Sequence, residues 1–163
     1  MRIMSIQSDA ERASAHRGMC VTSRCTEASG CVAIWSERLS NGPGSLNKFY
    51  GGGVTVGGTT CGSAVVKGVT STNSENIAGV LTLSAVRDNG QVTFSGDAST
   101  FHALSAKADD GIHVEADVTS TGGSIYFDGN ADDTVDSDDV VTFTDLTSVV
   151  AGQSVMGLSL IHI

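Results

Sequence analysis

Residues 83–100 read LSAVRDNGQVTFSGDAST, and residues 104–121 read LSAKADDGIHVEADVTST. At an offset of 21 residues (104 − 83 = 21) the two stretches share the opening Leu-Ser-Ala, an Asp, a turn glycine and the closing Ser-Thr. A unit of this length cannot enclose a hydrophobic core alone, so it must stack on copies of itself. The pattern predicts a β-solenoid in which Leu83 and Leu104 lie one above the other in neighbouring coils.

The chain from residue 51 onward shows the same pattern of short apolar runs separated by turn residues. Asn-Gly, Asp-Gly and Gly-Gly pairs mark sharp turns, because these residues accept a left-handed backbone. We therefore expect an all-β fold, a right-handed parallel β-helix (β-solenoid) of about four to five coils over residues 51–163. Between the turns, short β-branched runs alternate apolar and polar residues as half-buried strands do; they lie at 54–56, 63–66, 80–83, 91–94, 112–118, 124–127 and 140–144.

The same alternation predicts which side chains face the core. Stacking places like residues over like, so each coil covers the apolar face of its neighbour. The expected inward positions are Val80 or Leu81 with Leu83, Val92 with Phe94, Ile112 with Val114, and Ile125 with Phe127.

Residues 1–50 differ from the rest. They hold the only Trp, the only Pro and three of the four cysteines, and they show no sustained period, although residues 31–35 suit one strand. We expect an irregular leader or partial cap there, disordered or not native to the protein. The tail LSLIHI is either one more apolar strand or sequence foreign to the protein. Residues 51–163 are then expected to be a fragment of a longer array of repeats.

The charge is unevenly spread and limits the classes of partner. Residues 1–50 carry six of the nine basic residues and four of the 18 acids, whereas residues 51–163 carry three bases and 14 acids, a net charge of 3 − 14 = −11. Such an acidic body repels nucleic acid and anionic lipid and favours divalent cations. The sequence contains no run of about 18 apolar residues, the length that a membrane span needs. The first residues lack the apolar core of a signal peptide.

The four cysteines fit no common metal or redox motif. Cys20, Cys25, Cys31 and Cys61 give C-x4-C, C-x5-C and a long gap, and none of these spacings is the C-x2-C of zinc ribbons or redox proteins. Disulfides and free thiols are both compatible with the spacing.

Segments such as LSAKADDGIHVEADVTSTGGSIYFDG resemble the repeats of filamentous-haemagglutinin-like secreted and surface proteins. The resemblance covers residues 77–157 and lies in LxA, the D(D/N)G turn and T-x-T-G-G before a strand. It implies an extracellular structural or adhesive role in a long β-helix, with no catalytic residue of its own. Adjacent repeats of the same chain, surface glycans and other cell-surface proteins are the partners it implies.

Residues 128–139 read DGNADDTVDSDD and match the spacing of EF-hand and dockerin calcium loops. Oxygen ligands at alternating positions let a tight loop aim 6–8 oxygens at one Ca²⁺ ion. Three features depart from that pattern: Asp133 stands where the turn glycine belongs, Asp139 takes the twelfth position in place of a bidentate Glu, and VVTFT after the loop favours a strand over a helix. The candidate ligands are Asp128, Asn130, Asp132, Thr134, Asp136 and Asp139.

Three functions follow as hypotheses. The first is a non-enzymatic stalk or adhesive segment of a large repetitive protein that is secreted or displayed on the cell surface. The second is a calcium-dependent docking or carbohydrate-binding module centred on residues 128–139. The third is a polysaccharide-cleaving β-helix enzyme, in which Asp109 and Asp110 supply carboxylates and Lys107 is the nearby basic residue; an Asp-Asp-Gly turn explains the same residues without chemistry.

Overall fold

The computed structural model describes residues 20–21, 32–35, 51–134, 137–152 and 156–159, and in them short strands follow one another around a common axis. Every strand pairing is parallel. Consecutive strands do not pair with each other, so each strand lies beside the strand one coil earlier and one coil later. The prediction of a parallel β-solenoid is confirmed.

The strands form three sheets. The first contains β1 (Cys20–Val21), β3 (Gly51–Gly58), β5 (Ile77–Ala85), β8 (Ala103–Ala108), β11 (Ile125–Asp128) and β14 (Met156–Ser159). The second contains β2 (Val32–Trp35), β4 (Ala64–Lys67), β6 (Val92–Phe94), β9 (Ile112–Val114) and β12 (Val141–Phe143). The third contains β7 (Ser99–Phe101), β10 (Val118–Ser120) and β13 (Val149–Ala151).

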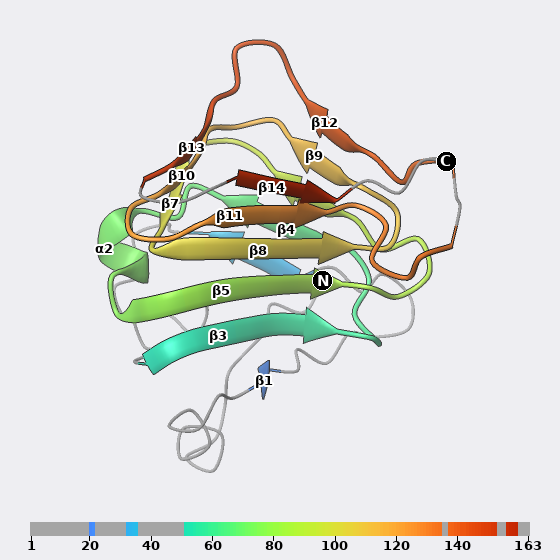
Figure 1. Ribbon diagram of the computed structural model, residues 1–163, viewed down its shortest axis with the longest axis horizontal. Helices are drawn as coiled ribbons and strands as arrows, with labels where there is room; N and C mark the ends of the chain where they lie inside the picture. The colour runs from blue at the N-terminus through green and yellow to red at the C-terminus, as the bar shows by residue number, and fades with distance from the viewer. Residues whose placement is uncertain (1–19, 22–31, 36–50, 135–136, 153–155, 160–163) are drawn as a thin grey trace.

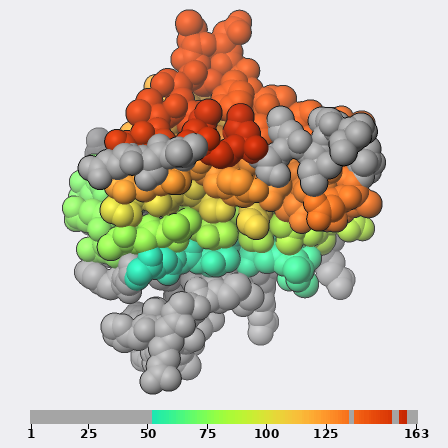
Figure 2. Space-filling view, in the orientation of Figure 1, coloured from blue at the N-terminus to red at the C-terminus, as the bar shows by residue number. Residues whose placement is uncertain are grey.

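The coils advance as a right-handed helix of about four turns. In Figure 1 the chain runs from left to right along β5, β8 and β11 at the front and returns behind through β9 and β12 while it rises. Figure 2 shows the same coils as bands of successive colour. A short helix, α2 (Ser71–Ser74), stands below β7 in the first coil, where the later coils have a strand; the sequence reading did not anticipate it.

The register of the coils differs from the expected one by two residues. Leu83 pairs with Ala106, and Leu104 pairs with Leu81, so the predicted stacking of Leu83 on Leu104 is wrong. Six residues separate β5 from β6 but only three separate β8 from β9, so no single offset aligns a whole coil. A slip of two residues keeps every side chain on its own face of the strand. The solenoid prediction therefore holds despite the error in register.

The core is one column of apolar side chains inside the coils. All the predicted inward residues are buried, with Leu81 rather than Val80 at the ambiguous position, because Val80 is 45 % exposed. Phe94 and Phe127, two coils apart, have ring centroids 5.7 Å apart. Ala106, which pairs in register with Phe127 from the intervening coil, has a small side chain. Burial of each large apolar side chain contributes roughly 1.5–3 kcal/mol.

The turns follow the chemistry expected of them. Asn89 and Gly111 have positive φ angles of 62° and 93°, as the Asn-Gly and Asp-Gly pairs predicted. The run at 112–118, expected as one strand, is split into β9 and β10 by residues 115–117. The strand expected at 31–35 is present as β2, which pairs with β4, and β1 pairs with β3.

The outermost described coil leaves its inward side chains uncovered. Met156 and Leu158 pair with the buried Ile125 and Phe127, yet they are 42 % and 44 % exposed. Phe143 pairs with the buried Val114 and is also 44 % exposed. The apolar rows of the core thus continue into this coil, and no described residue covers them. Among the described residues, no helix has the length and apolar character that crossing a membrane requires.

Candidate acidic corner

Three successive coils turn at the same corner, where the first sheet leads into the second. We call it the acidic corner: the turns 86–91 and 109–111 and the loop 129–140. Hydrogen bonds join the three levels, from Asp110 N to Gly90 O (2.9 Å) and from Gly111 N to Gly129 O (3.1 Å). The loop of the last level is several times longer than the turn directly beneath it. The candidate calcium loop is therefore an enlarged solenoid corner.

Asp109 is the buried acid of this corner. Its side chain is 3 % exposed, and Oδ2 accepts a hydrogen bond from the backbone N–H of Asn89 in the coil beneath (2.7 Å). Burial raises the pKa of the Asp109 carboxyl, and the nearby carboxyls of Asp132 and Asp88 raise that pKa further. The carboxyls of Asp109 and Asp132 also lie within hydrogen-bonding reach of each other. Carboxyl groups of two coils thus meet at one point.

The loop holds Asp132 by local hydrogen bonds. The backbone N–H of Thr134 donates to Asp132 Oδ1 (2.9 Å), and the Thr134 hydroxyl donates to Oδ2. Such side-chain to backbone bonds two residues apart are typical of Asx turns. Asp133, at the position where the calcium-loop pattern has glycine, adopts a φ of +60°. An Asp tolerates this left-handed conformation better than most residues, so the departure at the sixth loop position does not prevent a sharp turn.

Two further polar side chains of the loop are buried. Asn130 is 3 % exposed and Asp139 is 1 % exposed. Neither the amide nitrogen nor the carbonyl oxygen of the Asn130 side chain has a hydrogen-bond partner. A buried amide without a partner costs roughly 1–3 kcal/mol, and such groups in native structures are rare.

The expected six-residue calcium set is only partly gathered. Asp132 and Thr134 are in contact, whereas Asp128 Oδ2 accepts a hydrogen bond from the Tyr126 hydroxyl (3.4 Å) on the outer face. Asp136 lies outside the described residues. In the part of the chain that the structure describes, no three His, Cys, Asp or Glu side chains are grouped as they are in a metal site. The strand β12 follows the loop where an EF-hand or dockerin has a helix.

The partner that sequence reasoning missed is Asp109. Our prediction treated it as a member of a different turn, well before Asp132 in the chain. In a solenoid, turns of successive coils share one corner, so the signal was the repeat itself. Stacking the Asp-Asp-Gly turn under the acidic loop would have placed Asp109 there.

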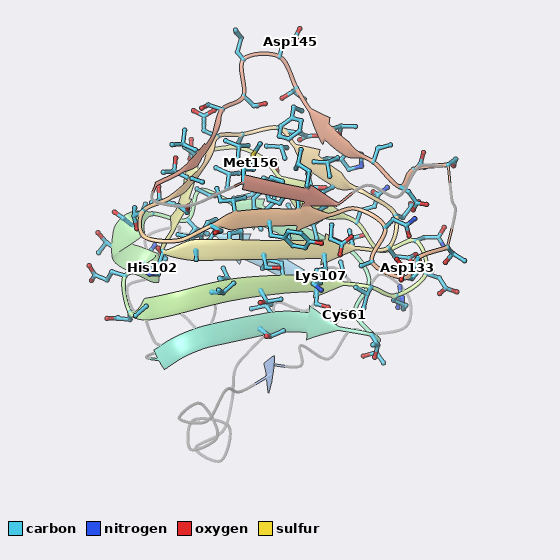
Figure 3. The ribbon with its side chains drawn as sticks, viewed as in Figure 1. Cys61, His102, Lys107, Asp133, Asp145 and Met156 are labelled. Carbon is cyan, nitrogen blue, oxygen red and sulfur yellow. The ribbon has the colours of Figure 1, made fainter. Side chains whose placement is uncertain are left out.

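The residues of the enzyme hypothesis differ in their exposure to solvent. Lys107 is exposed on the front of β8 (Figure 3) and pairs in register with Asp128. Asp109 is buried, and Asp110 Oδ2 accepts a hydrogen bond from Gln91 Nε2 (3.1 Å). A buried carboxylate is not accessible to a polymeric substrate.

The remaining candidates for a chemical role are the histidines and cysteines of the described residues, and they lie against other parts of the fold. His113 Nδ1 lies 2.8 Å from Thr142 Oγ1 in the next coil. The ring of His102 lies close to Gly122, where an added Cβ would come within 2.2 Å of it. Cys61 is buried; of the other cysteines, Cys20 lies in β1, and Cys25 and Cys31 lie outside the described residues.

The outer face of the first sheet presents hydroxyl groups in register. Thr55 pairs with Thr82, Thr82 with Ser105, and Ser105 with Tyr126. Each of these side chains is half-buried. Neighbouring strands in a sheet are about 4.8 Å apart, so the face carries polar groups at a regular spacing.

No protein-family model, curated protein or solved structure matches this chain. The resemblance to filamentous-haemagglutinin-like repeats stays a prediction from the repeats themselves.

Proposed function

We propose that this chain is a structural segment, a stalk or adhesive spacer, of a repetitive protein that is secreted or displayed at the cell surface, and that it is not an enzyme. The observation that carries the proposal is the apolar face that the described residues leave exposed on the outermost coil. Met156, Leu158 and Phe143 continue the inward rows of the core and are 42–44 % exposed. A further coil of the same register would cover them, because its inward residues would stack on theirs.

The packing supports a mechanical role. Each added coil lengthens a solenoid by one strand spacing, about 4.8 Å, whatever its loops contain. The buried side chains of the middle coils are almost all apolar, and the polar exceptions there are Ser99 in β7, Ser120 in β10 and Asp109 in a turn. The hydroxyl rows on the outside offer hydrogen-bond donors and acceptors at that same spacing. Surface glycans and other cell-surface proteins are the partners that such a face suits.

Duplication of one coil tests the proposal. Leu81 and Leu104 occupy the same position in successive coils, so a second copy of residues 81–103 inserted after Ala103 adds one complete coil. We expect a folded protein whose maximum dimension along the axis, measured by small-angle scattering, grows by about 4.8 Å. The matched control carries Leu81→Ser and Leu83→Ser in the inserted copy only. A duplicated chain that unfolds like this control would refute the stalk proposal.

The second candidate is a calcium-dependent docking or carbohydrate-binding module. The observation that favours it is the enlargement of the acidic corner, from the short turn 109–111 to the loop 129–140, with acids at several of the added positions. Binding of the chain to immobilised glycans, measured with CaCl₂ and then with a chelator, distinguishes the candidates. Retention that requires calcium supports a docking module, whereas retention that does not depend on calcium supports the spacer.

A further inference from the structure

Two acids from successive coils are held against each other in the acidic corner. Asp109 comes from the turn after β8, and Asp132 comes from the loop after β11. Their carboxyls are within hydrogen-bonding reach, and Asp88 in the coil beneath adds a third negative charge nearby. Two carboxylates within hydrogen-bonding reach of each other repel strongly unless a proton or a cation lies between them.

The backbone fixes this arrangement. Ala131 N donates to Ala108 O (2.8 Å), and Gly111 N donates to Gly129 O (3.1 Å), so residues 129–131 are tied to the turn beneath them. The N–H of Asn89 holds Asp109 from below. Both carboxyls are therefore positioned by neighbours that do not depend on a ligand, and such preorganisation lowers the cost of binding one.

Asn130 supplies an independent sign of a missing ligand. It lies between the two hydrogen bonds that tie the loop to the turn of Asp109, and its side chain is turned away from solvent, with 3 % exposed. Both polar atoms of the amide lack a partner there. A cation bound beside Asp109 would give the amide oxygen a partner and would remove that atom's share of the penalty.

We propose that Asp109, Asp132 and Asn130 form an inter-coil site for Ca²⁺. All three offer hard oxygen ligands, and Ca²⁺ takes 6–8 oxygens in flexible geometry, partly from water. Asp132 is exposed, so the ion can enter from solvent and keep bound water on that side. The site differs from the within-loop calcium pattern because Asp109 lies outside residues 128–139. The bound ion would clamp the enlarged corner to the coil beneath it.

The mutational test uses Asn as an isosteric replacement. Asp109→Asn keeps an oxygen for the Asn89 N–H and removes one charge, as protonation does. Asp132→Asn changes an exposed side chain and leaves the buried core untouched. The matched control is Asp145→Asn, an exposed acid in the loop between β12 and β13, at the crest of the molecule far from Asp133 (Figure 3).

Titration calorimetry with CaCl₂ on the chelator-treated full chain should show one ion per chain. We expect Asp109→Asn and Asp132→Asn each to weaken binding at least tenfold, and Asp145→Asn to change it less than twofold. No heat with the parent chain would overturn the proposal. So would Asp109→Asn binding like the parent while Asp128→Asn loses binding, because the ion would then belong to the loop alone.

Asn130→Ala gives a second readout that a purely structural residue would not give. In chelator, the melting temperature should not fall, because the amide has no hydrogen bond to lose. In CaCl₂, the calcium-induced rise in melting temperature should shrink, because ligand binding to the folded state stabilises it in proportion to affinity. A melting temperature that falls in chelator with an unchanged calcium shift would contradict the site. The site does not depend on the stalk proposal, and coil duplication tests that proposal separately.

Discussion

Truncation of Leu104 measures how firmly the coils enclose their core. Leu104 is 1 % exposed and lies between Leu81 in the coil below and Ile125 in the coil above. Leu104→Ala removes three carbon atoms, which is worth about 2.4 kcal/mol at roughly 0.8 kcal/mol per methylene. Hydrogen-bonded strands on both sides resist collapse into the space, so the cavity raises the expected loss to about 3–5 kcal/mol.

The assay is urea unfolding followed by far-ultraviolet circular dichroism, with Leu146→Ala as the control. Leu146 is 102 % exposed and has a φ of +68°. Leu and Ala are equally strained at that φ, so the control should change the free energy of unfolding by less than about 0.5 kcal/mol. A loss below about 1 kcal/mol for Leu104→Ala would refute the reasoning, because a side chain enclosed between two coils must leave a cavity.

Three further changes have expected outcomes. In chelator, the free energy of unfolding of the parent chain should rise as pH falls from neutral towards the unfolded-state pKa of Asp109, near its ordinary 3.8. The reason is that the pKa of Asp109 is raised in the folded protein, which therefore binds the proton more tightly than the unfolded chain does. Asp109→Asn should flatten this pH dependence, and equal pH profiles for the parent and the variant would contradict the prediction. Gly79→Ala should lower the free energy of unfolding, measured in urea, by about 1–3 kcal/mol, because the added Cβ would lie 1.0 Å from a backbone oxygen. Gly52→Ala is the control: a Cβ added there meets nothing within 4 Å, so this change should be tolerated. Phe127→Ala should cost about 3–5 kcal/mol and Phe143→Ala, at 44 % exposure, much less; equal losses would mean that the core does not end where the structure places its edge.

The faces of the strands were predictable from the sequence, but their exact neighbours were not. Alternation with a period of two identifies which side chains point inward, and Leu81, Phe94 and Ile112 are buried as expected. The identities between the two repeats placed Leu83 over Leu104, because they were matched at one offset of 21 residues along the whole repeat. The turns of the two coils differ in length, so one offset cannot give the register of every strand. The hydrogen-bonded register depends on those turns, and a slip of two residues leaves the alternation unchanged.

The candidate site illustrates the same limit. The composition of residues 128–139 predicted oxygen ligands for a cation, and a linear motif assigns every ligand to one loop. Stacking brings Asp109 to the same corner, and no local pattern around Asp132 specifies that neighbour. The burial of Asn130 was equally hidden, because an Asn-Ala-Asp segment in a loop is normally expected to be solvated.

Hydrogen-bond scalar couplings measured by nuclear magnetic resonance test the central claim, the stacking of successive coils in the observed register. In the structure, Asp109 N donates to Ala85 O (3.1 Å) and Glu115 N donates to Phe94 O (2.8 Å). We expect couplings from the Ala85 carbonyl carbon to the Asp109 nitrogen and from the Phe94 carbonyl carbon to the Glu115 nitrogen. A coupling from Ala85 to the nitrogen of Lys107 would mean the register of the sequence repeat, with Leu83 beside Leu104, and no coupling between these coils would contradict the solenoid itself.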